Sequence, residues 1–187
     1  MTKKNKIGHL QSDEMLMKGL CIGQKHAFEI LYDRYFDKLV YFANGFVKNQ
    51  HQAEDIVQEV FIKLIEQPQQ FNPSMRFSTW VFTLTANRCK NNIRDTQNRS
   101  QLIENNVIQE AIELNSKHDL SWLNKNLTQG IEQLNPKEKT IYTLRFEEEM
   151  SLKEIAETID IPIGSVKSGL FHLLKKLAKQ LSAYTYE

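Results

Sequence analysis

The run Ala53–Phe61 carries Glu54, Asp55, Gln58 and Glu59 within little more than one helical turn. Paired carboxylates can serve as general acid and base in catalysis. Here the helical spacing turns them outward, and they show neither a catalytic arrangement with His, Ser or Cys nor the spacing of metal ligands. An acidic helix face of this kind suits docking on a basic protein surface, although an ordinary solvated face explains the same residues.

A second informative segment lies near the C-terminus. No Asp or Glu occurs between Ile161 and Tyr186, whereas four lysines do: Lys167, Lys175, Lys176 and Lys179. A short helix before Asp160 and a longer one after Pro162 give a helix-turn-helix pattern. A positive second helix fits the DNA major groove, with lysines on phosphates and side chains near its front on base edges. A solvated amphipathic helix is the alternative.

A third segment combines aromatic and basic residues. Phe77-Ser78-Thr79-Trp80 follows an Asn-Pro-Ser loop, and the second half of the following helix is basic. Rings that stack on unpaired bases and cations that follow phosphates are what single-stranded nucleic acid requires. A short loop beside an aromatic ring can also hold a base that has left the stack. Phe82 is expected in the core, and for Trp80 core packing and base stacking are equally supported.

Composition bounds the class of protein. Hydrophobic residues make up 41% of the 187 residues, which is enough to build a core, and the net charge of +1 favours no partner by itself. Cys21 and Cys89 are far apart and lack metal-ligand spacing, so neither a disulfide scaffold nor a metal site is expected. Because no apolar run is long enough to cross a bilayer and no signal core follows the basic N-terminus, a cytoplasmic location is expected.

Apolar residues at three- and four-residue steps predict helices almost throughout. Helices are expected over about 26–47, from Asn49 to Pro68, over 78–94, near 120–134, from Asn135, from Ser151, and from Pro162 to about 183. Residues 96–118 are rich in Asn, Gln, Ser and Glu and predict a linker. The expected fold is all-α, with two small helical domains at 1–95 and 119–187 joined by a flexible linker at 96–118.

Several residues are expected to set helix ends. Ser78 is the predicted N-cap of its helix, and Asn135 with Glu138 and Ser151 with Glu154 predict capping boxes. Asp160 is expected at positive φ in the turn. In the last helix the inward stripe is expected to comprise Val166, Leu170, Leu173, Leu174, Leu177 and Leu181.

Together these segments resemble the extracytoplasmic-function (ECF) sigma factors of bacterial RNA polymerase. The resemblance covers roughly residues 25–95, which correspond to region 2, and 120–181, which correspond to region 4. It is carried by Ala27-Phe28 with Leu31-Tyr32, by AlaGluAspIleValGlnGluValPhe at 53–61, by PheSerThrTrpValPhe at 77–82 with Asn87, and by GlySerValLysSer at 164–168.

The resemblance implies three binding surfaces. Core polymerase is expected to contact Asp55, Gln58 and Glu59. The −10 promoter element is expected to contact Phe71, Asn72, Ser74, Met75, Trp80, Asn87 and Arg88. The −35 element is expected to contact Arg145, Ser165, Lys167, Ser168, Phe171, His172 and Lys175.

The implied function is that of a transcription initiation factor rather than an enzyme, with no cofactor. Its implied partners are core RNA polymerase, promoter DNA and an anti-sigma protein, without membrane insertion. The sequence departs from the family pattern at Gly169, His172 and Leu174, where Arg is frequent, and at Asn91, where Asp is common.

Two other functions fit parts of the pattern. A dimeric helix-turn-helix repressor would bind a palindrome tightly without polymerase. A helical adaptor would bind only protein and would open no promoter.

Overall fold

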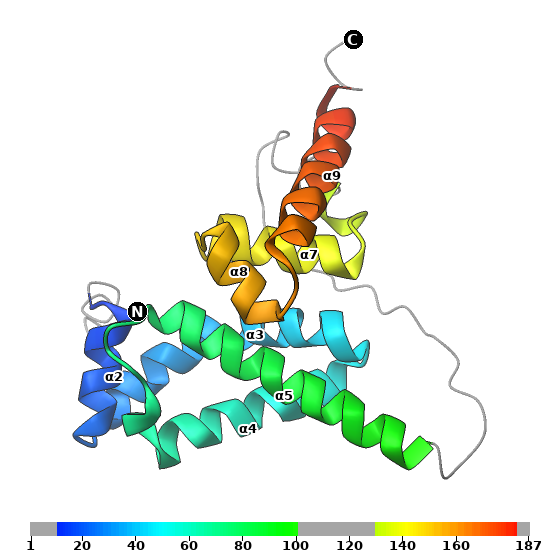
Figure 1. Cartoon of the computed structure of the whole chain (residues 1–187). Coiled ribbons are helices and arrows are strands. Elements are labelled where there is room, and N and C mark those ends of the chain that lie inside the picture. Colours follow the sequence, from blue (N-terminus) through cyan, green and yellow to red (C-terminus); the bar gives the residue numbers. More distant parts are fainter. Residues whose placement is uncertain (1–10, 101–129, 183–187) are drawn as a thin grey trace.

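The computed structural model describes residues 11–100 and 130–182 of the chain. All regular structure in these two ranges is helical, as expected (Figure 1). The helices are α2 (Asp13–Cys21), α3 (Lys25–Val47), α4 (Gln50–Glu66), the 3-10 turn η1 (Pro68–Gln70), α5 (Phe77–Ser100), α7 (Pro136–Tyr142), the π-helical η2 (Thr143–Glu147), α8 (Leu152–Ile159) and α9 (Ile163–Ser182).

Side chains cap the starts of α4, α7 and α8, and the capping boxes predicted at Asn135 and Ser151 are confirmed. The side chain of Asn49 accepts the N–H of Gln52 at the start of α4. Asn135 with Glu138 and Ser151 with Glu154 form reciprocal capping boxes, which satisfy N–H groups that lack a partner within the helix. Asp160 ends α8 at φ 57°, the left-handed conformation expected for the turn.

The start of α5 differs from the prediction. The helix begins at Phe77, so Ser78 lies inside it and is buried rather than serving as the N-cap. The N–H of Phe77 instead donates to Glu14 Oε1 on α2, 3.0 Å away. The helix α2 lies before the expected helical segments and supplies this partner. The C-terminal end of α5 is Ser100, past the expected boundary at residue 95, and most of the expected linker falls outside the described residues.

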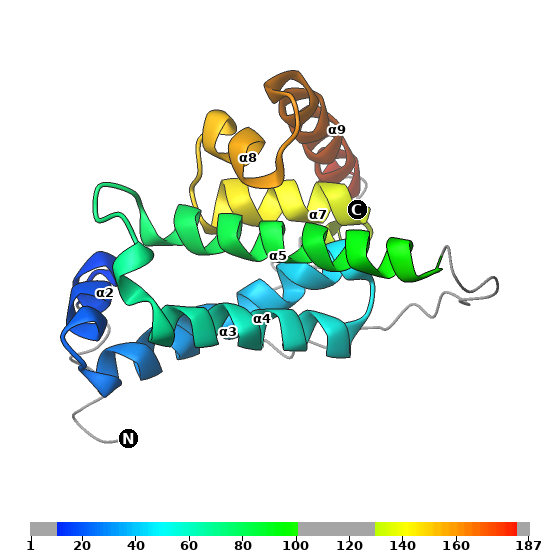
Figure 2. The ribbon, with the colours of Figure 1, turned by 60° about the horizontal axis from the view of Figure 1, so that its bottom comes forward.

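Helices α2 to α5 form an N-terminal bundle in which α3 packs against α4 and α5. Its core contains four large aromatic side chains that are at most 2% exposed: Phe42, Phe61, Phe77 and Phe82. The expected core position of Phe82 is confirmed. Figure 2 shows α4 on the side of this bundle that faces away from α8 and α9.

Helices α7 to α9 form a C-terminal block. In α9, Val166, Leu173 and Leu177 are buried, as expected, and Leu170 is half-buried. The prediction for Leu174 is wrong, because its side chain is 47% exposed. Successive residues of a helix are about 100° apart, so Leu174 turns away when Leu173 and Leu177 face inward. The side chain of Leu181 lies outside the described part of the chain.

The two units pack directly on each other along a seam, where α8 covers α5 and α7 lies against α3 (Figure 1). One continuous apolar cluster runs through the seam, from Phe82 and Cys89 to Ile155 and Ile159. Polar contacts accompany it: Thr83 Oγ1 lies 3.1 Å from Thr158 Oγ1, Thr79 Oγ1 donates to Glu154 over 3.2 Å, and Lys90 pairs with Asp160 at 3.3 Å.

The most buried charge at the seam is Glu148, whose side chain is 5% exposed. Lys38 Nζ donates to its Oε1 over 2.7 Å while remaining 44% exposed itself. A carboxylate that loses water on burial requires such a partner, because an unpaired buried charge is strongly unfavourable. The pair therefore stabilises the contact between the loop after η2 and α3.

We expect Lys38→Met to lower the free energy of unfolding by about 1–3 kcal/mol, because Glu148 then loses its charged hydrogen-bond donor. Urea denaturation measures this change. Lys18→Met, which replaces an exposed lysine of α2, is the control and should change stability little. Equal stability of wild type and Lys38→Met would show that the pair does not hold the seam.

Candidate functional site

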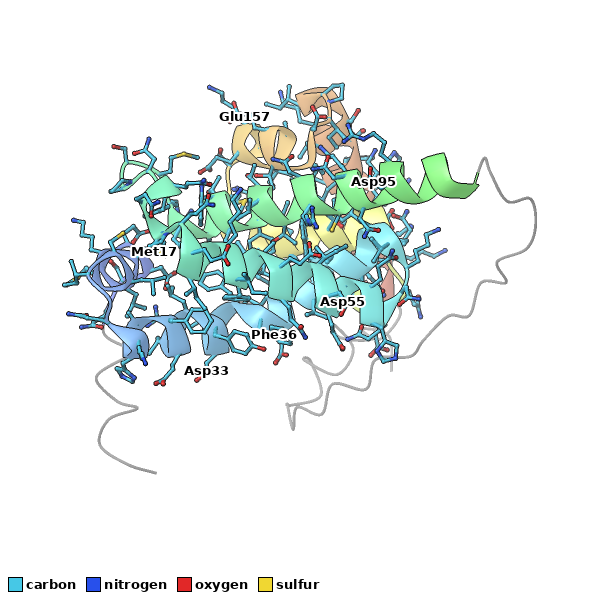
Figure 3. The ribbon with its side chains drawn as sticks, turned by 90° about the horizontal axis from the view of Figure 1, so that it is seen from below. Met17, Asp33, Phe36, Asp55, Asp95 and Glu157 are labelled. Atoms are coloured by element: carbon cyan, nitrogen blue, oxygen red, sulfur yellow. The ribbon has the colours of Figure 1, made fainter. Side chains whose placement is uncertain are left out.

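Asp55, Gln58 and Glu59 form an exposed acidic surface on α4. The opposite side of this helix supplies core residues: Ala53, Ile56, Val57 and Val60. Figure 3 shows Asp55 on the outer side of α4, remote from the C-terminal block. The exposure needed for docking on another protein is therefore present, and the three predicted residues share one face.

The acidic surface adjoins a basic residue of α5. Glu59 on α4 and Arg88 on α5 form an ion pair in which the guanidinium Nε donates to the carboxylate, and each side chain is 49% exposed. The hydrogen bond that Arg88 donates to Glu59 raises the pKa of Arg88. Nearby, Gln52 Nε2 donates to Asn92 Oδ1 over 2.7 Å. The surfaces predicted for polymerase and for the −10 element thus adjoin.

The loop before α5 presents some predicted residues and hides another. Asn72, Ser74 and Met75 are exposed, and Asn72 Oδ1 accepts the N–H of Ser74 over 3.0 Å, which fixes the turn. Phe71 is only 6% exposed and packs edge-to-face on Phe77 and Trp80. Its ring belongs to the core, so the expectation that its side chain contacts DNA needs correction.

The residues of α5 that are predicted to contact the −10 element differ in exposure. Asn87 and Arg88 are exposed, whereas Trp80 is half-buried, with its ring centroid 5.4 Å from that of Phe71. Trp80 therefore combines core packing with partial exposure. The face of α5 that carries Thr79 and Thr83 is used by the seam and is not available to another partner while the seam is closed.

Five residues of α9 form an exposed basic face: Lys167, Ser168, Phe171, His172 and Lys175. Ser165 is half-buried in the first turn of α9. Arg145, predicted to act with them, lies on η2, where its Nη1 donates to the carbonyl of Met150 over 2.8 Å. Lys176 turns toward α7 and donates to Glu138 over 2.7 Å.

Gly169 explains one departure from the family pattern. A Cβ at this position would lie 2.6 Å from Cδ1 of Ile141 on α7, which is closer than real contacts allow. The absence of a side chain at Gly169 leaves room for the end of the Ile141 side chain. Sequence reasoning noted Gly169 as a missing basic residue, whereas an isolated glycine inside a helical pattern also signals such close packing.

Three carboxylates secure the helices that carry these surfaces. Hydrogen bonds from the backbone N–H groups of Phe77 and Ser151 lower the pKa of Glu14 and Glu154, respectively. Burial alone would raise the pKa of Glu138, but the bonds from Lys176 and the N–H of Asn135 outweigh it and lower the pKa. Sequence reasoning identified Glu138 and Glu154 and missed Glu14, whose partner is 63 residues away.

The described residues contain no cluster of His, Cys, Asp and Glu suited to a metal ion, and none of their helices is long and apolar enough to cross a membrane. Cys21 and Cys89 are both free thiols. Cys89 lies on α5 in the apolar core, and burial raises the pKa of its thiol to about 12. The thiol therefore stays protonated. The exposed features that remain are an acidic face on α4 and a basic face on α9.

Comparison with known families agrees with this geometry. Residues 31–99 match the family described as sigma-70 region 2, and residues 124–177 match the one described as sigma-70, region 4. The chain belongs to the ECF group of the sigma-70 family. The acidic surface on α4 therefore lies in region 2 and the basic face of α9 in region 4.

Relatives in this group are similar along most of their length. The ECF RNA polymerase sigma factor SigW of Bacillus subtilis (strain 168) is 29% identical over 175 residues, covering 85% of this chain and 91% of SigW. The RNA polymerase sigma-H factor of Pseudomonas aeruginosa is 27% identical over 182 residues, covering 91% and 94%. These similarities support a role in transcription initiation.

Two solved structures share the fold. One is the sigma factor RpoE in complex with the anti-sigma factor NepR from Bartonella quintana, with a TM-score of 0.61, 20% identity and coverage of 84% of this chain and 98% of that one. The other is CnrH in complex with the cytosolic domain of CnrY, with a TM-score of 0.54, 18% identity and coverage of 94% and 100%. At these identities they support the fold alone.

The carboxylate of Glu14 yields a pH-dependent prediction. Its pKa in the folded chain lies below the ordinary 4.5, so its contribution to stability is complete above pH 4.5 and is lost as the pH falls through the folded pKa. We expect Glu14→Gln to lower stability at pH 7 by about 0.3–1 kcal/mol, since the start of α5 then lacks a negative charge.

The difference in the free energy of unfolding between wild type and Glu14→Gln should become smaller below pH 4.5. Urea denaturation at several pH values measures it. Asp33→Asn removes an exposed carboxylate of α3 and is the control. A difference that stays constant with pH would contradict the role given to the charge of Glu14.

Proposed function

We propose that this chain binds core RNA polymerase through Asp55, Gln58 and Glu59, and directs it to promoters by contacting the −35 and −10 elements and promoting melting. The observation that carries the proposal is the division of charge between two exposed helix faces. The acidic surface of α4 suits a basic protein partner, and the acid-free face of α9 suits phosphates. This arrangement fits a protein that positions polymerase on promoter DNA and does not itself catalyse a reaction.

At the −35 element, α9 would enter the major groove as the second helix of the helix-turn-helix. Lys167 and Lys175 lie about two helical turns apart on the basic face and suit phosphates or base acceptors. Ser165 and Ser168, near the helix N-terminus, are placed for base edges or backbone. Arg145 would have to exchange its bond to the Met150 carbonyl for a phosphate.

At the −10 element, Asn72, Ser74 and Met75 would surround a base that has left the stack, and Asn87 and Arg88 would follow the single strand. Trp80 packs on Phe71 at the start of the loop, and its exposed part would stack on a base. Stacking of this kind contributes about 1–3 kcal/mol for each base. Melting would be favoured because these contacts form only with unpaired DNA.

An anti-sigma protein is the third proposed partner. Of the two structural neighbours described above, one is the sigma factor RpoE in complex with the anti-sigma factor NepR, and the other is CnrH in complex with the cytosolic domain of CnrY. In this chain such a protein would compete with polymerase for the acidic surface or with promoter DNA for the basic face. We also propose that residues 1–95 and 119–187 act as the two functional domains, with 96–118 as the linker.

The closed seam must open for this function. The promoter elements are named for positions about 25 base pairs apart, which is about 85 Å of duplex at about 3.4 Å per base pair. A compact chain of 187 residues has a radius of gyration of only about 16 Å. Separation of the C-terminal block from α3 and α5 therefore precedes simultaneous binding to both elements.

Transcription with purified chain, core polymerase and genomic DNA fragments tests the proposal. Specific initiation that depends on the chain, mapped to defined start sites, supports it. Specific duplex binding without polymerase would support the repressor alternative, and failure of both would support the adaptor alternative.

For the polymerase contact, we expect Asp55→Ala combined with Gln58→Ala to weaken binding to core polymerase at least tenfold while the fold survives, because both side chains are exposed. Affinity measured with labelled chain and circular dichroism give the two readouts. Asp33→Ala on α3 is the control for loss of surface charge. Unchanged affinity of the double variant would remove the acidic surface from the interface.

The ion pair between Glu59 and Arg88 predicts a link between the two region 2 surfaces. In the free chain Glu59 neutralises Arg88, so binding of Glu59 to polymerase would release Arg88 for DNA. We expect Glu59→Gln to raise the affinity of the free chain for a single-stranded −10 oligonucleotide by about two- to fivefold, the range of a surface ion pair.

Fluorescence anisotropy at low salt measures that affinity. Asp55→Asn makes the same change in net charge on the same helix and is the matched control. An equal gain in both variants would show general electrostatics rather than release of Arg88, and would contradict the link.

A further inference from the structure

The C-terminal block covers one stripe of α5. Three side chains of α5 make its polar contacts with α8 and the turn after it: Thr79, Thr83 and Lys90. They stand four and seven residues apart, a spacing that returns to the same side of a helix. Thr79 is only 7% exposed. While the seam is closed, this covered stripe is therefore closed to any other partner.

The covered stripe adjoins residues of α5 that are predicted to contact the −10 element. Asn87 stands four residues after Thr83 and three before Lys90, so it shares a helix face with both. A helix with its side chains is about 10–12 Å wide, so α8 extends beyond the stripe that it contacts. Asn87 is exposed to water, but a nucleotide is far larger than a water molecule. A strand of DNA laid against Asn87 would meet α8.

The charge of α8 is opposite to that of the part of α5 beside it. Residues 152–160 contain three acidic side chains and one lysine, whereas residues 88–94 contain three basic side chains and no acid. Lys90 Nζ lies 3.3 Å from a carboxylate oxygen of Asp160. An acidic helix end on a basic helix occupies the place that phosphates would take.

Asp160 is explained better by this contact than by its turn. It ends α8 at φ 57°, a conformation that is unfavourable for residues with a Cβ and that glycine adopts without strain. The turn therefore does not require an aspartate. The ion pair with Lys90 is the contact that its carboxylate makes across the seam.

We propose that the closed seam is autoinhibitory: α8 is an acidic cover that excludes single-stranded DNA from α5 until the C-terminal block separates from it. This inference rests on the proposed function and adds to it. The distance between the promoter elements requires opening only for simultaneous contact with both. Occlusion by α8 prevents the contact of α5 with a single strand even when no −35 element is present.

A disulfide across the seam tests the inference. The Oγ1 atoms of Thr83 and Thr158 are 3.1 Å apart, so Thr83→Cys with Thr158→Cys brings two sulfur atoms near the bonding distance of about 2.0 Å. The variant is made together with Cys21→Ser, because Cys21 is an exposed thiol and Cys89 is buried. Thiol titration measures the extent of coupling, and circular dichroism verifies the fold.

The probe is a fluorescein-labelled oligothymidylate, since stacking and phosphate contacts tolerate any sequence. In fluorescence anisotropy at low salt, we expect the oxidised chain to bind it at least tenfold more weakly than the same chain after reduction. Both forms should bind core polymerase equally, because α4 lies on the side of the bundle that faces away from α8 (Figure 2).

Asp160→Asn tests the charge of the cover without a cross-link. Asparagine also tolerates the left-handed conformation, so the turn is kept. We expect the affinity for the oligothymidylate to rise about two- to fivefold, the range of an exposed ion pair. Glu157→Gln is the matched control, because it makes the same change in net charge on α8 at a side chain that is 67% exposed and pairs with Lys153. This control should change the affinity little.

Three results would overturn the inference. They are equal binding by the oxidised and reduced chain, absence of binding by both included; failure of the introduced cysteines to couple in a folded chain; and a gain in Asp160→Asn no larger than that in Glu157→Gln. A failure of the proposed function looks different. Wild-type chain with core polymerase would then initiate from no promoter, whereas the oligothymidylate comparison requires no polymerase.

Discussion

The arrangement of the functional helices depends on carboxylates that satisfy helix N-termini and also reach a second helix. Glu14 stands in the first turn of α2 and accepts the first N–H of α5. Glu154 completes the capping box of α8 and binds Thr79 of α5, and Glu138 completes that of α7 and binds Lys176 of α9. Because a helix start leaves several N–H groups without partners, the same charge that begins one helix can fix the position of another.

Charge is divided unevenly between the two units. In the N-terminal bundle the acidic surface projects from α4 on the side away from the C-terminal block, where a large protein could approach (Figure 3). In the C-terminal block the lysines of α9 are exposed, while Glu138 lies inward against Lys176. A net charge of +1 conceals this division, which only the distribution of residues reveals.

The seam sets a limit on what the chain can do in its closed form. Its apolar cluster and the pair of Lys38 with Glu148 hold α7 and α8 on the bundle, yet the acidic surface and the basic face remain exposed. Closure therefore restricts the distance between the two surfaces rather than access to each. A partner that prefers the open or the closed form would shift the equilibrium by its difference in affinity for the two.

The amino-acid sequence by itself determined the all-α fold, the capping boxes at Asn135 and Ser151, the left-handed turn at Asp160 and the faces of α4 and α9. These features depend on residues within one or two turns of each other, so spacing is sufficient to find them. Membership of the sigma-70 family was also visible in short motifs at 53–61, 77–82 and 164–168.

Only the tertiary structure decided the rest. Phe71 stands in a polar loop but is buried because Phe77 and Trp80 fold over it. Ser78 has the chemistry of an N-cap but lies inside α5, since Glu14 already binds the first N–H. A Cβ at Gly169 would meet the end of the Ile141 side chain on α7, and the seam joins segments more than 70 positions apart. Such contacts depend on where distant helices meet, and local periodicity carries no information about that.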